Sequence, residues 1–146
     1  MNADAPEELD ELISVFETVF GMEDLQRPDK AHLQSLLSSN HFFAVVASAD
    51  DRIIAGLTVY LLDQYYSKKA LAYVFDLAVL PAYQRKGVGK KLMEFTNRYC
   101  RQKGCEEVFV QADKVDEHAL EFYRSTQAAN EEQVVHFSYT LTKNEP

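Results

Sequence analysis

The 146-residue chain contains no tryptophan, two cysteines, five glycines and four histidines. No apolar run approaches the roughly 18 residues that a membrane-spanning helix needs, so no membrane partner is expected. Neither the cysteines nor the histidines have the spacing of a metal site, and two cysteines make no disulfide framework, so we expect no metal. The acidic N-terminal stretch lacks the apolar core of a secretory signal. These absences predict a cytoplasmic protein with reduced thiols.

Basic residues are also scarce, 15 against 23 acidic ones, which gives a formal net charge of -8. Residues 1–29 hold nine acidic side chains and one basic one, whereas residues 84–104 hold seven basic side chains and one acidic one. Because the basic region is short, we expect no nucleic-acid partner. The charge pattern instead favours a small anionic ligand at the basic stretch and a cationic ligand elsewhere.

The length fits a single domain over residues 1–146. Apolar spacing first follows the helical period and then changes to strand-like runs. The pattern predicts helices at 6–20, 28–39, 88–103 and 116–125, and strands at 42–47, 52–63, 70–80, 108–112 and 134–141. The long apolar strand at 70–80 is expected to be buried on both faces. Hairpins followed by a β-α-β crossover predict an α+β fold, with a mixed, mostly antiparallel sheet flanked by helices.

The stretch Gln84-Arg85-Lys86-Gly87-Val88-Gly89 connects the predicted strand 70–80 to the helix that follows. Glycines that uncover backbone N–H groups, a helix N-terminus and several cations form a suitable phosphate site. A basic helix start in which the glycines only make the turn explains the same residues, and the chemistry alone leaves both interpretations open. The spacing differs from the P-loop and from the dinucleotide-binding fingerprint.

The same six residues match the acetyl-CoA signature Q/R-x-x-G-x-G/A at every defined position, between a DLAVLP strand and an amphipathic helix. The chain therefore resembles the GNAT acetyltransferases, and the order of its predicted elements agrees with a GNAT-like fold over nearly the whole length. The resemblance implies acetyl-CoA as cosubstrate, held by backbone amides of the loop and by main-chain groups of the preceding strand. The implied cofactor-binding residues are Leu77, Ala78, Val79, Gln84, Arg85, Lys86, Gly87, Val88, Gly89 and Lys90.

Four segments are similar to aminoglycoside 3-N-acetyltransferases of the GNAT type: residues 32–47, 73–79, 108–123 and 131–137. This resemblance implies direct acetyl transfer, in a ternary complex, to the 3-N amine of an aminoglycoside, an antibiotic-resistance activity. The resemblance to the family also implies a homodimer. Two alternatives stay open. One is a GNAT enzyme that acts on another polyamine, small amine or protein amine, and the other is a CoA-binding domain without turnover.

The reaction needs a base for the acceptor's ammonium and an acid for the departing thiolate. By resemblance Asp113 binds the amine and accepts its proton, directly or through water, and Tyr123 protonates the thiolate. From the residues alone, Asp113 can instead cap its own loop and Tyr123 can pack in the core. Asp76 is a second catalytic and substrate-binding candidate, or a structural carboxylate. Asp116 and Glu117 are candidates for further ammonium groups, although Asp116 also suits a helix cap.

Two departures from the family pattern bear on the acceptor side. Phe75 stands where many GNAT proteins have a glutamate, which moves the role of base toward Asp113. The segment 124–133 replaces the usual glycine turn after the tyrosine helix, so we expect the acceptor to differ from that of other family members.

Overall fold

The structure is a computed structural model that describes residues 5–22 and 26–142. The chain divides into two compact units, residues 1–111 and 112–146, and each is described by itself. The expectation of one domain stays a prediction. In the described parts of the chain, no helix is long and apolar enough to cross a membrane.

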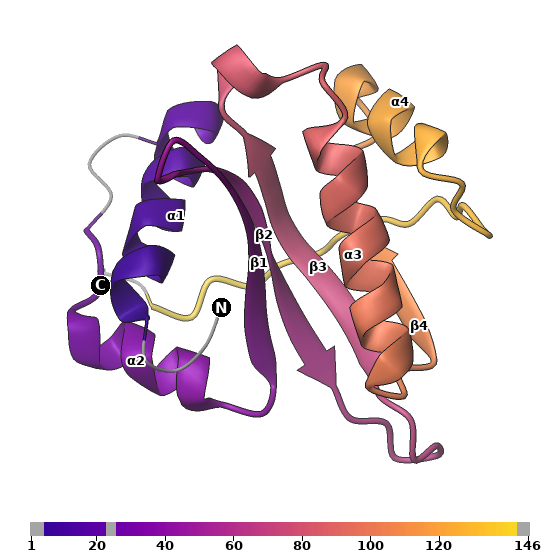
Figure 1. The fold of residues 1–146 in the computed structure, drawn as a ribbon. Helices are drawn as coiled ribbons and strands as arrows, with labels where there is room; N and C mark the ends of the chain where they lie inside the picture. Colours follow the sequence, from indigo (N-terminus) through magenta and orange to yellow (C-terminus); the bar gives the residue numbers. More distant parts are fainter. Residues whose placement is uncertain (1–4, 23–25, 143–146) are drawn as a thin grey trace. The chain divides into compact units, whose positions relative to one another are not determined.

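The first unit is built on a four-stranded sheet with strand order β1-β2-β3-β4 (Figure 1). β1 pairs with β2 and β2 with β3 in antiparallel fashion, and β3 pairs with β4 in parallel. The strands are β1 (Phe42–Ala49), β2 (Arg52–Leu62), β3 (Leu71–Val79) and β4 (Glu107–Val110). This arrangement confirms the predicted mixed, mostly antiparallel sheet flanked by helices.

The α-helices of the first unit in the described residues are α1 (Pro6–Phe20), α2 (Lys30–Ser38) and α3 (Val88–Gln102). α1 starts with a proline in its first turn and ends at Gly21, whose φ of 65° few other residues adopt readily. α2 is capped by Asp29, whose carboxylate accepts a hydrogen bond from the backbone N–H of His32 at 2.9 Å. These local signals place the helix boundaries within two residues of the prediction.

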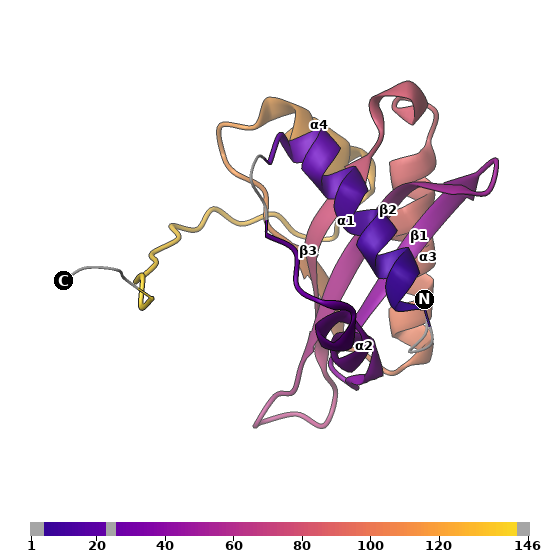
Figure 2. The ribbon, with the colours of Figure 1, turned by 90° about the vertical axis from the view of Figure 1, so that its left-hand side faces the viewer.

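Helices cover both faces of the sheet, α1 on one side and α3 on the other (Figure 2). On the α1 side, Gly56 of β2 lies so close to Leu12 that a Cβ built there would stand 2.5 Å from a leucine methyl. On the α3 side, the ring of Phe43 meets that of Tyr99 edge to face at 5.0 Å. Glycine at position 56 therefore lets α1 sit directly on the sheet.

The expectation that strand 70–80 is buried on both faces is wrong. Ala72 and Val74, on the α3 side of β3, are fully buried. On the opposite side Tyr73 is half-buried and Phe75 is 54% exposed. The strand is long and apolar because aromatic side chains line its open face, and it therefore looks like a doubly buried strand in the sequence.

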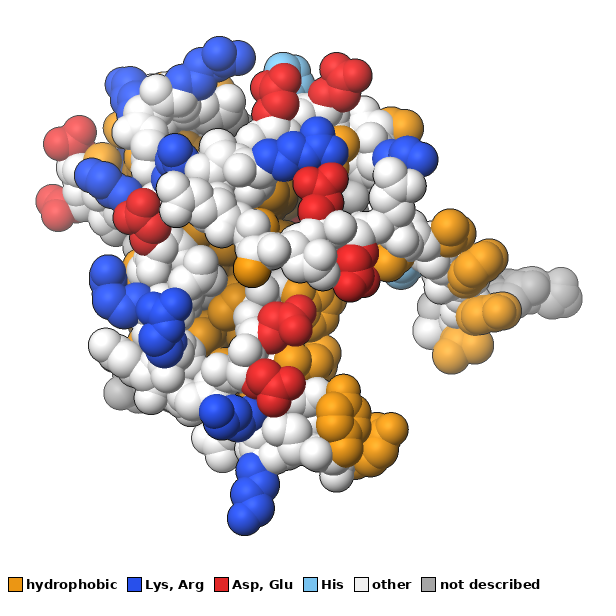
Figure 3. All heavy atoms as spheres, turned by 90° about the vertical axis from the view of Figure 1, so that its right-hand side faces the viewer, with side chains coloured by type: hydrophobic (Ala, Val, Ile, Leu, Met, Phe, Trp, Pro, Cys, Tyr) orange, Lys and Arg blue, Asp and Glu red, His pale blue; other side chains and the backbone are white. Residues whose placement is uncertain are grey.

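The second unit contains α4 (Glu117–Ser125) and an extended C-terminal segment. The predicted strand at 134–141 is wrong for this structure, because these residues join no sheet. Their apolar side chains are exposed, Phe137 by 77% and Leu141 by 89%. Figure 3 shows apolar side chains along the segment that leads to the C-terminus. A strand needs a neighbour for its backbone groups, and the described residues of this chain supply none.

Candidate active site

The glycine-rich loop leaves β3 through a short 3₁₀ turn, Pro81–Tyr83, and enters α3. The side chain of Gln84 turns back and donates from Nε2 to the carbonyl oxygen of Val79 at 2.8 Å, which ties the loop to the strand end. Arg85 and Gly87 both have positive φ, 63° and 84°. Gly87 is the N-cap of α3 and brings no side-chain cap to the helix start. The first-turn N–H groups of α3 therefore point out of the helix without an intrahelical partner.

Cations surround this helix start. Arg85, Lys86 and Lys90 are exposed, and the Lys86 ammonium lies 5.8 Å from the centre of the Tyr83 ring. No ion pair of these three side chains is found in the described residues. Free N–H groups, the positive end of a 15-residue helix and unpaired cations together suit a phosphate group. Of the two interpretations of this loop, its geometry favours the anion site.

The sheet opens next to this loop. The parallel β3–β4 ladder ends at the pair Val74↔Val110, whereas β3 continues to Val79. Leu77, Ala78 and Val79 pair with β2 on their other side. Within the first unit their remaining main-chain groups face no strand. The Val79 carbonyl already accepts from Gln84, and the other groups can bond to an extended ligand. The loop and the open strand edge thus lie at the same end of β3.

Asp76 lies in this open part of β3 and is half-buried. Its backbone N–H donates to the Thr58 hydroxyl oxygen at 3.3 Å. Burial raises the pKa of the Asp76 carboxyl above its ordinary value. Burial also raises the pKa of Tyr60, and the negative charge of Asp76 adds to that rise. The phenol of Tyr60 and the carboxyl of Asp76 are therefore close enough to interact.

A row of aromatic rings crosses the same face of the sheet, and the sequence analysis did not identify it. Tyr60 meets Phe75 at 5.7 Å, Phe75 meets Tyr73 at 5.7 Å, and Tyr73 stacks on Phe109 at 4.7 Å. The Tyr73 hydroxyl donates to Gln111 Oε1 at 3.2 Å. Aromatic faces attract ammonium groups, so this row could bind a cation beside Asp76. These rings lie side by side because of the register of β2, β3 and β4, and the sequence alone does not show that register.

The other predicted site residues belong to the second unit. Asp113 is exposed, and its Oδ1 accepts a hydrogen bond from the Val115 N–H at 3.1 Å, which leaves the other carboxylate oxygen for a ligand. Asp116 caps α4 by accepting from the Ala119 N–H at 3.1 Å. Glu117 is exposed in the first turn of α4, and Tyr123 is half-buried near its end. The capping interpretation thus fits both aspartates, and for Asp113 it does not exclude amine binding.

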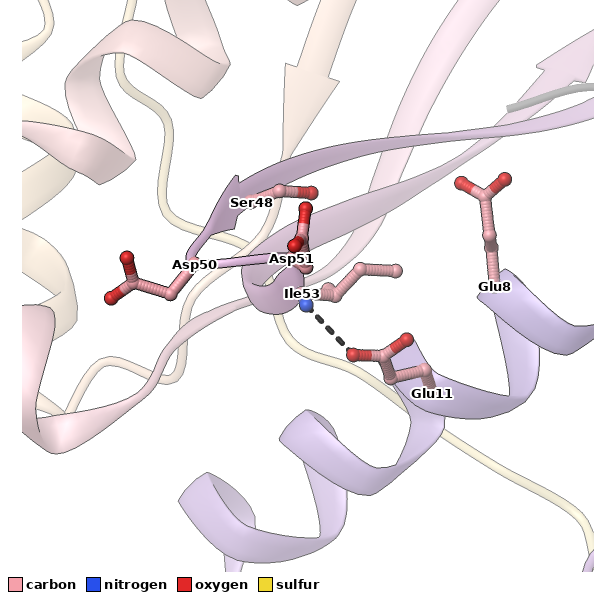
Figure 4. A pocket seen from close by; sticks show the side chains of 6 residues that line it. All are labelled: Glu8, Glu11, Ser48, Asp50, Asp51 and Ile53. Carbon is pink, nitrogen blue, oxygen red and sulfur yellow. Dashed lines mark hydrogen bonds between the residues drawn. The ribbon is translucent and has the colours of Figure 1, made fainter.

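A surface pocket lies between α1 and the β1–β2 turn (Figure 4). Its lining is acidic, with Glu8 and Glu11 on the helix and Asp50 and Asp51 at the turn. Glu11 accepts a hydrogen bond from the Ile53 N–H at 2.7 Å, so this carboxylate fastens α1 to the hairpin. Among the residues that the structure describes, no group of three or more His, Cys, Asp or Glu side chains could hold a metal ion. Glu11 therefore has a structural role at this pocket.

Comparison with known proteins gives similarities along most of the chain. The structure of the aminoglycoside acetyltransferase meta-AAC0020 from an uncultured soil metagenomic sample, in complex with sisomicin, is 52% identical, with a TM-score of 0.95 over 97% of this chain and 93% of that chain. That of the aminoglycoside acetyltransferase HMB0005, also from soil, is 28% identical, with a TM-score of 0.89 over 97% and 95%. AAC(6')-Iy in complex with CoA shares the fold at 20% identity and a TM-score of 0.76, over 97% of this chain and 92% of that chain.

Among curated proteins, aminoglycoside N(6')-acetyltransferase type 1 of Salmonella typhimurium is 28% identical over 87 residues, 56% of this chain. The matched region spans 60% of that relative's length. The sequence profile of the acetyltransferase (GNAT) family matches residues 8–127, which is most of the chain and includes residues of both units. Enzymes of this family use acetyl-CoA as acetyl donor. The chain therefore belongs to the acetyltransferase (GNAT) family.

Proposed function

We propose that the protein transfers acetyl from acetyl-CoA to one amine of an aminoglycoside. The observation that carries this proposal is the 52% identity, over 97% of the chain, to an aminoglycoside acetyltransferase whose complex contains sisomicin. An aminoglycoside is a polycation, and the half-buried Asp76 beside an aromatic row offers both a negative charge and ring faces to ammonium groups. Such an activity would protect a cell from these antibiotics.

The position of the acetylated amine is a separate question. The resemblance in the sequence implied the 3-N amine. The relatives whose names specify a position, the Salmonella enzyme and AAC(6')-Iy, have N(6') instead. We therefore propose the 6'-amine as the acceptor, with the 3-N amine as the alternative.

We propose that the cosubstrate binds across the loop and the open edge of β3. Backbone N–H groups from Lys86 to Lys90 would hold the pyrophosphate, with the free cations of the loop as counter-charges. The main chain of Leu77, Ala78 and Val79 would bond to the pantetheine arm. Acetyl-CoA supplies the acetyl group as a thioester, and the residues of this chain bind, orient and exchange protons.

The transfer itself requires proton transfers from the acceptor nitrogen and to the sulfur. We propose that Asp113 accepts a proton from the acceptor's ammonium, directly or through a water molecule, so that the nitrogen lone pair can attack the thioester carbonyl. The carbon–sulfur bond then breaks, the Tyr123 hydroxyl gives its proton to the departing thiolate, and the second proton of the acetylated nitrogen passes, directly or through water, to the Tyr123 phenolate. Asp76 would bind a further ammonium group of the polycation, and Asp116 and Glu117 are candidates for the same role.

An amine panel tests the acceptor. With purified protein and acetyl-CoA, we expect thiol release with sisomicin-like aminoglycosides that carry a 6'-amine and little release with analogues that carry a 6'-hydroxyl. NMR of the product should place the acetyl group on the 6'-nitrogen. Turnover of spermidine or a lysine peptide without aminoglycoside turnover would point to the other amine classes. CoA binding without any turnover would indicate a non-catalytic CoA-binding domain.

A pair of glycine substitutions tests the loop. Gly87 and Gly104 flank α3 with nearly equal φ, 84° and 86°, and a Cβ at either would meet no atom within 4 Å. Both Gly→Ala changes should therefore cost similar stability, about 1 kcal/mol, from left-handed strain. Only Gly87→Ala should weaken the binding of CoA, because it disturbs the N–H groups of the loop. We expect the Kd for CoA, measured by calorimetry, to rise by about tenfold. Equal CoA affinities of the two variants would contradict the assignment.

Asp76→Asn separates stability from activity. Because burial raises the pKa of the folded carboxyl, the folded state binds this proton more tightly than the unfolded chain does. The folded state is favoured while the Asp76 carboxyl is protonated. This contribution to the free energy of unfolding is present at low pH and is lost as the pH rises through the raised pKa. The variant, which stays neutral, should therefore gain stability over the wild type as the pH rises above the ordinary aspartate pKa of about 3.9. Urea unfolding at several pH values measures this gain.

The same Asp76→Asn variant should lose about 10- to 100-fold in kcat/KM for the aminoglycoside, because it lacks a charged hydrogen-bond acceptor. Glu94→Gln, which changes an exposed carboxyl of α3, serves as control and should alter neither property. Full activity of Asp76→Asn would leave this carboxylate with a structural role only.

Asp113→Asn and Tyr123→Phe test the proton transfers. Each variant should lower kcat by about 100-fold or more with little change in CoA affinity, because each removes a proton acceptor or donor and leaves the loop intact. Steady-state kinetics with the best aminoglycoside of the panel measures the loss. The controls are Glu121→Gln and Tyr65→Phe, which alter an exposed carboxyl and an exposed phenol. Unchanged rates in both test variants would mean that these roles are wrong.

A further inference from the structure

Two polar side chains are buried in the described part of the chain, those of Thr58 and Thr96. Thr96 lies in α3, and its hydroxyl donates to the Leu92 carbonyl oxygen of the preceding turn at 2.8 Å. That bond within one helix accounts for its burial. Thr58 lies in β2, and its hydroxyl oxygen accepts from the backbone N–H of Asp76 in the neighbouring strand at 3.3 Å. Thr58 therefore links two strands through a side chain.

β3 has a β-bulge opposite Thr58. Between two successive ladder pairs, β2 has one residue, Thr58, whereas β3 has two, Phe75 and Asp76. Phe75 lies on the face opposite to α3, and Ala78 packs on that same face in the core that includes α1. Strict alternation would put residues three apart on opposite faces. The bulge therefore turns the Asp76 side chain to the face of Phe75 and of the aromatic row.

The packing of β2 does not itself require a hydroxyl at position 58. In the buried run Ile53–Val59, Thr58 has the one polar side chain. Valine has nearly the same shape and needs no hydrogen-bond partner, whereas a buried hydroxyl costs free energy unless it is hydrogen-bonded. The N–H of Asp76 supplies such a bond at the bulge. The hydroxyl of Thr58 thus matches a need of β3.

We propose that Thr58 is a positioning residue for acetyl transfer, because its hydroxyl oxygen holds the bulge and keeps the Asp76 carboxyl on the acceptor face. β2 lies between β1 and β3 in the sheet, so the hydroxyl projects from a strand that is paired on both sides (Figure 1). Burial keeps water from competing for the N–H of Asp76. The inference rests on the proposed function, in which Asp76 binds an ammonium group of the acceptor. Thr58 acts through Asp76 and is assigned no contact with the acceptor.

Amide hydrogen exchange tests the hydrogen bond without any ligand. Thr58→Val removes the acceptor and keeps the shape, whereas Thr58→Ser keeps the hydroxyl. We expect the amide of Asp76 to exchange about tenfold faster in Thr58→Val and at the wild-type rate in Thr58→Ser. Thr96→Val, which removes the other buried hydroxyl, is the control and should leave this amide unchanged. Equal exchange of the Asp76 amide in Thr58→Val and the wild type would overturn the proposal.

Steady-state kinetics tests the positioning. Thr58→Val should raise the KM for the aminoglycoside about tenfold and leave kcat and the Kd for CoA within about twofold, because it displaces one acceptor-binding carboxyl only. Thr58→Ser should restore the wild-type KM, and Thr96→Val should not change it. Thr58→Ala, which also lacks the hydroxyl, should repeat the result if Thr58→Val folds poorly by circular dichroism. An unchanged KM in a folded variant without the hydroxyl would contradict the positioning role.

A double-mutant cycle tests whether Thr58 acts through Asp76. In the Asp76→Asn background, Thr58→Val should raise the KM for the aminoglycoside little further, because the charge that it positions is already absent. Independent, additive losses would show that Thr58 acts by another route and would overturn the proposal. A wild-type protein that acetylates no aminoglycoside would refute the proposed function and with it a role of Thr58 in that reaction. The exchange of the Asp76 amide would still show whether Thr58 holds the bulge.

Discussion

The point at which β3 and β4 stop pairing determines most of what the first unit can bind. Up to Val74↔Val110 the two parallel strands satisfy each other, and beyond it β3 continues alone to Val79. Unpaired main-chain groups inside a sheet are costly unless a ligand or another chain satisfies them. The early end of β4 therefore leaves an open strand edge along Leu77–Val79 with the half-buried Asp76 in the same stretch, and this is where we propose that the ligands bind.

We propose that an anionic and a cationic ligand bind near the open edge of β3, each through a different kind of interaction. The loop after β3 attracts anions through backbone N–H groups and exposed cations, which are well solvated when empty. Asp76 instead sits among aromatic rings, where burial raises its pKa. Burial disfavours the ionised form of the Asp76 carboxyl, and a nearby ammonium group favours it. Binding of an ammonium group would therefore stabilise the ionised carboxylate. An active site commonly sacrifices stability in this way.

Local signals made much of the fold predictable. The glycine motif predicted the start of α3 at Val88, and Gly21 predicted the end of α1. Gly87 and Gly21 flank these helices with positive φ. The strands of the sheet and their mixed order also followed from apolar patterning. The aromatic row did not, because Tyr60, Tyr73 and Phe109 share a face only through the register of three strands. Alternation along one strand cannot show which side the helices leave open.

The C-terminal segment marks the limit of local reasoning in another way. Its alternating apolar residues predicted a strand, because Val135, Phe137 and Tyr139 would line one face of a sheet, and the structure has none there. A strand, unlike a helix, satisfies its backbone groups only through a neighbour, and the pattern does not say whose.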